Sequence, residues 1–221
     1  MIGPVPLDRP LPPWPRLREA WWVYGIGAAL VALYGVGLVV RIRCTVYGRC
    51  GGSARLLDLD ALGGVPRLAT TALFVATAVL AWGASRRASG RVALWWAAIA
   101  GAGAVLAVLK LVSAHAAAKS HSAALTLGGS VVLATGALAA LWLLGRRWGV
   151  PATGPVALAL ALYAGAAIGL DAVTSVVAAV QAHAGALTDV ATVFVEELGE
   201  ALTALILLVV VRWEGSRTAP R

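Results

Sequence analysis

Charged residues are scarce in this chain. Asp, Glu, Lys and Arg make up 13% of its 221 residues, against 60% hydrophobic residues. A soluble globular domain carries roughly 25% charged and about half apolar residues. The composition therefore excludes an ordinary soluble protein and predicts a chain that lies in a membrane. The net charge of +8 comes from basic residues beside apolar segments, where they hold topology and meet lipid headgroups. We expect membrane lipid as a partner and no nucleic acid.

Long polar stretches are also missing, which leaves no room for a soluble module. Six apolar segments reach or approach the roughly 17 residues that a membrane span needs. The sequence predicts an all-α, polytopic six-helix transmembrane bundle with both termini in the cytoplasm (N-in/C-in). Its spans are expected at 21–40, 68–84, 92–112, 123–144, 156–180 and 190–211.

The predicted domains follow from these segments. Residues 1–20 hold six of the ten prolines and are expected to form a Pro-rich cytoplasmic arm. No short apolar run follows a basic start there, so we expect no signal peptide. The six-span domain covers 21–214, with an extracytoplasmic loop at 41–67 and a cytoplasmic tail at 215–221. The richness in Arg, Ala and Gly is typical of a GC-rich genome, and we expect a bacterial cytoplasmic membrane protein.

Cysteine is nearly absent, and both copies, Cys44 and Cys50, lie in the first loop. The loop contains no histidine, so a disulfide is favoured over a metal or redox pair. A disulfide forms outside the reducing cytoplasm. The N-in orientation also places eleven basic residues in cytoplasmic segments and six outside, as the positive-inside rule requires. Residues 56–62 in the same loop fit either a short amphipathic stretch on the outer membrane surface or an ordinary turn.

Ionisable residues within the spans are few, and such residues usually mark function because a bilayer makes them costly. From the helical rise of about 1.5 Å per residue, Asp171 and Glu200 are expected near the bilayer midplane. Lys110 is expected only about one turn below the outer surface. With a period of 3.6 residues, polar side chains on spans four to six would line one cleft open to the outside. The predicted transport or ion-binding residues are Lys110, Asp171, Glu196, Glu197 and Glu200.

Carboxylate oxygens favour a hard divalent cation such as Mg²⁺, Ca²⁺ or Mn²⁺, which is therefore a possible cofactor or substrate. Histidine would shift the preference toward Zn²⁺ or Fe²⁺. Three histidines, expected at the outer rim, are weak metal candidates because they lack a familiar zinc spacing. They are His115, His121 and His183.

The fragment from Glu197 to Leu202 resembles the Arg-Glu-x-x-Glu helix of bacterial and fungal high-affinity iron permeases. The resemblance covers about ten residues of the chain. Glu196 stands where that family has arginine, and the family's second copy of the motif is absent. What the resemblance implies is cation handling by Glu197 and Glu200.

These features predict a transporter or channel that handles a cation, a proton or a proton-coupled solute through intramembrane carboxylates. Two alternatives stay open. One is a membrane-embedded, metal-dependent enzyme acting on lipid. The other is a non-catalytic accessory subunit whose acidic face pairs with a partner helix. A homo-oligomer or a membrane partner subunit is compatible with each of them.

Overall fold

The computed structural model describes residues 20–48, 50–51, 54–59, 61, 63–112, 123–170, 172–173 and 185–218. Across these residues the secondary structure is helical, with short turns and no strand. A short π-helix, η2, continues α7, and its wider turn is a local departure from regular α-helical geometry. The elements are α1 (Trp21–Thr45), α2 (Ala54–Leu57), α3 (Val65–Arg87), α4 (Gly90–Val112), α6 (Ala123–Arg147), α7 (Thr153–Ala164), η2 (Gly165–Gly169) and α9 (Ala186–Ser216).

Four helical segments are long and apolar enough to cross a membrane: Trp21–Thr45, Val65–Arg87, Gly90–Val112 and Leu127–Arg147. The prediction of an all-helical protein with transmembrane character is therefore confirmed. Helices also occupy the described parts of the fifth and sixth predicted spans, as α7 with η2 and as α9. That these two segments cross the membrane, and that the bundle is N-in/C-in, stays a prediction.

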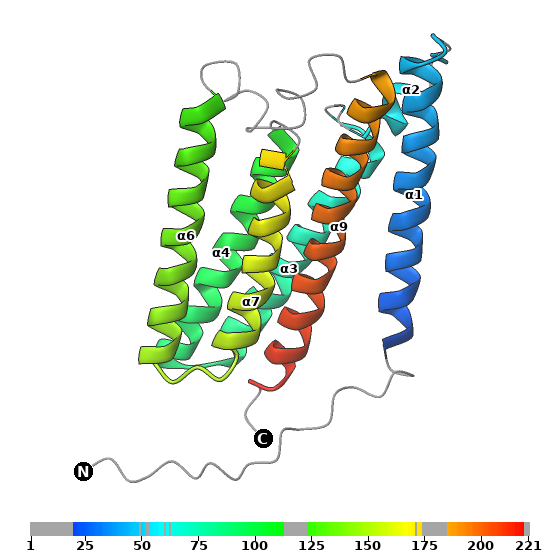
Figure 1. Ribbon diagram of the computed structural model, residues 1–221. Coiled ribbons are helices and arrows are strands. Elements are labelled where there is room, and N and C mark those ends of the chain that lie inside the picture. Colours follow the sequence, from blue (N-terminus) through cyan, green and yellow to red (C-terminus); the bar gives the residue numbers. More distant parts are fainter. Residues whose placement is uncertain are drawn as a thin grey trace, which may run out of the picture.

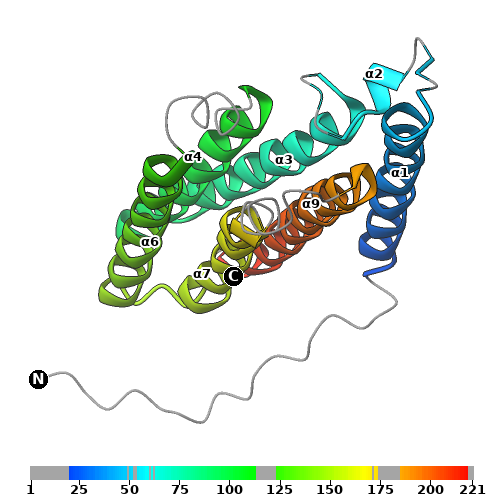
Figure 2. The ribbon, with the colours of Figure 1, turned by 45° about the horizontal axis from the view of Figure 1, so that its top comes forward.

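The helices run side by side, with α1 and α6 at opposite edges and α3, α4, α7 and α9 between them (Figures 1 and 2). The start of α1 and the end of α9 lie at the same end of the bundle (Figure 1). There the Arg212 guanidinium stacks 4.8 Å from the centre of the Trp22 ring, which joins these two helix ends. Such a cation–π contact is worth about 0.5–1 kcal/mol at an exposed site.

The core lies where α3, α4 and α9 pack together. Its largest fully buried side chains include Trp95, Trp96 and Phe74. The Phe74 ring meets Tyr163 of α7 edge to face, with centroids 4.8 Å apart. These contacts bring α3, α4, α7 and α9 around one interior, and the charged side chains described below lie in it.

Helix α6 is attached mainly near its last turns. The Trp95 indole Nε1 of α4 donates to the Leu141 carbonyl of α6 at 3.1 Å. At Gly145 a Cβ would lie 2.7 Å from Trp95 Nε1 and would overlap the Thr153 side chain, so only glycine permits this approach. The most apolar 18-residue window of α6 has no buried residue. An apolar groove of about 420 Å³ separates its middle from α7 and η2, and is lined by Val131, Ala134, Thr135, Leu138, Ala161, Ala164, Gly165, Ile168 and Gly169.

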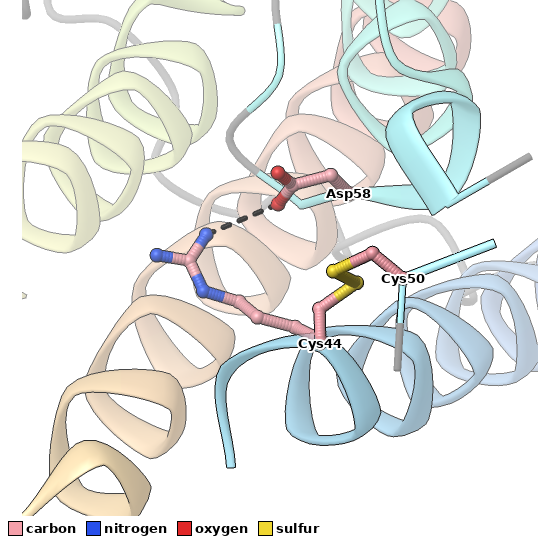
Figure 3. Close-up of a disulfide and its surroundings, with 4 residues drawn as sticks. Cys44, Cys50 and Asp58 are labelled. Atoms are coloured by element: carbon pink, nitrogen blue, oxygen red, sulfur yellow. Dashed lines mark hydrogen bonds and ion pairs between the residues drawn. A yellow bond between two sulfur atoms is a disulfide. The ribbon is translucent and has the colours of Figure 1, made fainter. Parts of the chain in front are cut away.

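The connection between α1 and α3, residues 46–64, is here called the strap. The predicted disulfide is confirmed: Cys44, at the end of α1, is bonded to Cys50, and their Cα atoms are 4.6 Å apart (Figure 3). Beside it, Arg41 Nη1 donates to Asp58 Oδ1 at 3.1 Å (Figure 3). The strap contains the single turn α2, after which Leu59 is fully buried. Leu59 therefore anchors this segment in the protein interior.

Candidate functional site

Two carboxylates of α9 lie in the interior of the bundle. Glu197 and Glu200 are three residues apart, so they share one face of the helix. They are 6% and 7% exposed. Glu196, on the neighbouring face, is half-buried and makes contacts of its own. The helical face that enters the interior is thus the one that carries Glu197 and Glu200.

Lys110 of α4 joins these two carboxylates. Its Nζ donates to Glu197 Oε2 at 2.8 Å and Oε1 at 3.0 Å, and to Glu200 Oε2 at 2.8 Å. All three side chains are at most 10% exposed. Charge-assisted hydrogen bonds of this length are among the strongest in proteins. The three residues form what we call the charged triad.

The depths expected from the sequence placed Lys110 near the outer surface and Glu200 near the bilayer midplane. The structure instead brings these two side chains into contact. Lys110 lies only two residues before the end of α4, yet its ammonium reaches the level of Glu200, fourteen residues after the start of α9. The ends of the two helices are therefore offset along the bundle. A lysine stem of four methylene groups also carries the charge away from its own Cα.

Three further side chains surround the triad, one each from α1, α3 and α7. Tyr163 is close enough to act electrostatically on Glu197 and Glu200. Arg67, 2% exposed, is close enough to act electrostatically on Glu197. The Tyr34 hydroxyl donates to the Pro66 carbonyl at 3.0 Å and is 2.7 Å from Thr70 Oγ1. Five helices thus contribute to one polar interior.

From its position in the sequence Arg67 was expected in the outer loop, and neither tyrosine was among the predicted site residues. The sequence does indicate that Arg67 belongs to a helix, because Arg67, Thr70, Phe74 and Thr77 recur at the spacing of one helix face. All four side chains of this α3 face are buried. Polar residues on one face of an apolar helix indicate an interior rather than a loop.

The described part of this interior holds side chains of both charges. Within the described side chains, Glu197 and Glu200 carry two negative charges, and Lys110 and Arg67 carry two positive ones. Removing an ion from water costs several kcal/mol, and good geometry with opposite charges offsets that cost.

The other predicted site residues lie outside the described residues. They are Asp171, His115, His121 and His183. Among the residues that are described, no group of three or more His, Cys, Asp or Glu side chains is placed to hold a metal ion. The groove beside α6 is apolar apart from Thr135, and so it differs from the polar cleft expected along spans four to six. The predicted metal ligands and the outward-opening cleft remain predictions.

Comparison with protein-family models, curated proteins and solved structures gives no significant match for this chain. Its function has therefore to be argued from the triad and its surroundings.

Proposed function

We propose that the protein is a transporter or channel of the bacterial cytoplasmic membrane that handles a proton or another cation at the charged triad. One observation carries the proposal: the Lys110 ammonium bridges Glu197 and Glu200 in the bundle interior. Ionisable groups within membrane segments usually line the path of an ion or a proton. A purely structural need would be met at lower desolvation cost by apolar packing.

The geometry favours a proton or a monovalent cation over a divalent one. The Lys110 ammonium lies between the two carboxylates, in the place that a bound cation would take. A second positive ion must therefore displace it or wait until Lys110 loses a proton. Mg²⁺ additionally requires oxygen ligands at about 2.0–2.1 Å in a near-octahedral set. The described part of the site offers two carboxylates whose charges are already neutralised.

Proton flux in reconstituted vesicles tests the proposal. Vesicles containing the protein and a pH-sensitive dye are given a pH gradient, with Na⁺ or K⁺ salts outside. We expect Glu200→Gln and Glu197→Gln each to slow the dye response at least about tenfold, because an amide cannot exchange a proton and intramembrane carboxylates carry such flux. Glu214→Gln is the matched control, since Glu214 lies on the same helix and pairs with Arg217 at its end. Rates equal to wild type in both triad variants would rule out the proposal.

The proposed topology is six spans with both termini in the cytoplasm. It is supported by the basic residues at the expected inner ends and by the disulfide at the end of α1. The common location of the start of α1 and the end of α9 agrees with an even number of crossings (Figure 1). Green fluorescent protein fused after residue 221 is therefore expected to fluoresce, because it folds in the cytoplasm. The orientation would be contradicted if this fusion stayed dark while a reporter that works only in the periplasm was active when fused at the same position.

A further inference from the structure

The Lys110 ammonium is held in the way that a bound ligand would be held. Three carboxylate oxygens, Glu197 Oε1 and Oε2 and Glu200 Oε2, lie 2.8–3.0 Å from its Nζ. An ammonium group has three N–H donors and no acceptor, so the two carboxylates supply one acceptor for each donor. Glu197 and Glu200 therefore form a cradle that fits a primary ammonium group, irrespective of the molecule that carries it.

The two carboxylates belong to a firmly packed part of α9. Ala201 and Ala204, which follow them on the inner side of the helix, are fully buried. Gly199 lies between the two glutamates in the sequence, and a Cβ added to it would be only 2.8 Å from Leu170 Cδ1. Close packing of this kind resists displacement of the backbone. The acceptors of the cradle are thus held in fixed positions.

The helix that supplies the ammonium is packed differently at this level. Among the buried residues of α4, Ala107 comes last in the chain. The four apolar residues of the turn that follows are between 45% and 57% exposed: Val108, Leu109, Leu111 and Val112. Lys110 is the inward-pointing side chain of this turn, and its side chain is only 10% exposed. Local opening concentrates in segments with few buried apolar contacts, so the last turn of α4 is the part of the triad that can move.

Exchange of one ammonium group for another keeps the charge of the cradle constant. Two buried carboxylates without their cation are costly, and an ammonium solute brings one positive charge as Lys110 removes one. A quaternary ammonium lacks the N–H donors that the three oxygens accept. A guanidinium presents five donors in a planar fork and does not match acceptors gathered around one nitrogen. The cradle therefore favours ammonium or a primary amine in its protonated form.

We infer that Glu197 and Glu200 form a binding site for a primary ammonium group, and that Lys110 is its tethered occupant. Ammonium or a small primary alkylammonium replaces the Lys110 side chain when the last turn of α4 moves outward. The inference rests on the proposed function, because it names the class of cation handled at the charged triad. A tethered group competes at a high effective concentration, so the external cation binds more weakly to the intact protein than to a protein without the lysine.

Thermal unfolding of the full chain in detergent, at constant ionic strength, tests the inference without relying on transport. Lys110→Ala removes the tethered ammonium and leaves space for methylammonium, the probe. We expect methylammonium chloride to raise the unfolding midpoint saturably, with half of the effect at a concentration at least about tenfold lower than in the wild type. Tetramethylammonium chloride is the control salt and should leave the midpoint unchanged. Lys110→Ala with Glu200→Gln is the control protein, which should not respond because it lacks one side of the cradle.

Hydrogen exchange of the wild-type protein supplies a second measurement that does not depend on the folding of a variant. At a high methylammonium concentration, the amides of residues 108–112 should exchange at least about threefold faster than in the same concentration of tetramethylammonium, while those of 95–107 stay unchanged. Equal midpoints of Lys110→Ala in the two salts overturn the inference. An equal methylammonium response in the control protein, or unchanged exchange at 108–112, also overturns it. Methylammonium binding without proton flux in any protein would refute the proposed function alone.

Discussion

Replacing Lys110 with methionine is expected to lower the free energy of unfolding by about 3–5 kcal/mol, the usual cost of removing one partner from a buried ion pair. Methionine keeps most of the volume of the lysine stem. It leaves Glu197 and Glu200 without the ammonium that now lies within 3.0 Å of both. Arg67 acts on Glu197, but the described cluster would then hold two negative charges against one positive charge. Thermal or denaturant unfolding of the purified protein in one detergent measures the loss.

The matched control restores charge balance without restoring the ion pair. A protein carrying Lys110→Met together with Glu200→Gln loses one basic and one acidic side chain and keeps Glu197, on which Arg67 acts. We expect it to recover most of the lost stability, since the cost lies in the uncompensated charge and not in the missing contacts. Equal destabilisation of the single and the double variant would show that packing, rather than charge, dominates at this site.

Replacing Trp95 with alanine is expected to cost about 3–5 kcal/mol, as for large-to-small changes in protein cores. Trp95 is 1% exposed, packs edge to face on Trp96 with centroids 5.1 Å apart, and donates to Leu141. Its loss would leave a cavity between α4 and α6 and remove a hydrogen bond that fixes α6. The midpoint of thermal unfolding, followed by circular dichroism in detergent, measures the effect.

Trp82 provides the comparison for this substitution. It lies on α3, is 52% exposed, and faces away from the core. Trp82→Ala removes the same side chain without opening an interior cavity, so we expect a much smaller change. A similar decrease in both variants would mean that tryptophan at the protein–lipid boundary, and not packing of α4 against α6, determines stability.

The helical character of the chain and four long apolar segments were predictable from the sequence, because long apolar runs admit few structures within a membrane. The sequence also indicated Lys110, Glu197 and Glu200, since buried charges stand out against an apolar background. Their mutual contact was not predictable from spacing along one helix. It depends on how far α4 and α9 are shifted against each other, and that shift is set by the packing of whole helices.

The face of the fifth segment that points to the interior was hard to predict for a different reason. The prediction assumed 3.6 residues per turn throughout, whereas Gly165–Gly169 forms a π-helix with a wider turn. A helix face calculated across this segment with a constant period is therefore rotated relative to the face that the structure has. The two glycines that bound η2 are consistent with an irregular turn, but two glycines at this spacing are also typical of close helix packing in membranes. Composition alone does not separate these two outcomes.

The triad has a consequence for biosynthesis. Lys110 is separated from Glu197 and Glu200 by 87 and 90 residues. At about 5–20 residues per second, a ribosome needs roughly 4–17 s after making Lys110 to produce its first partner. During that interval the hairpin of α3 and α4 carries a cation whose carboxylates do not yet exist. The last helix therefore supplies the carboxylates that pair with Lys110. A protein truncated before α9 would present this lysine without them to the membrane quality-control proteases.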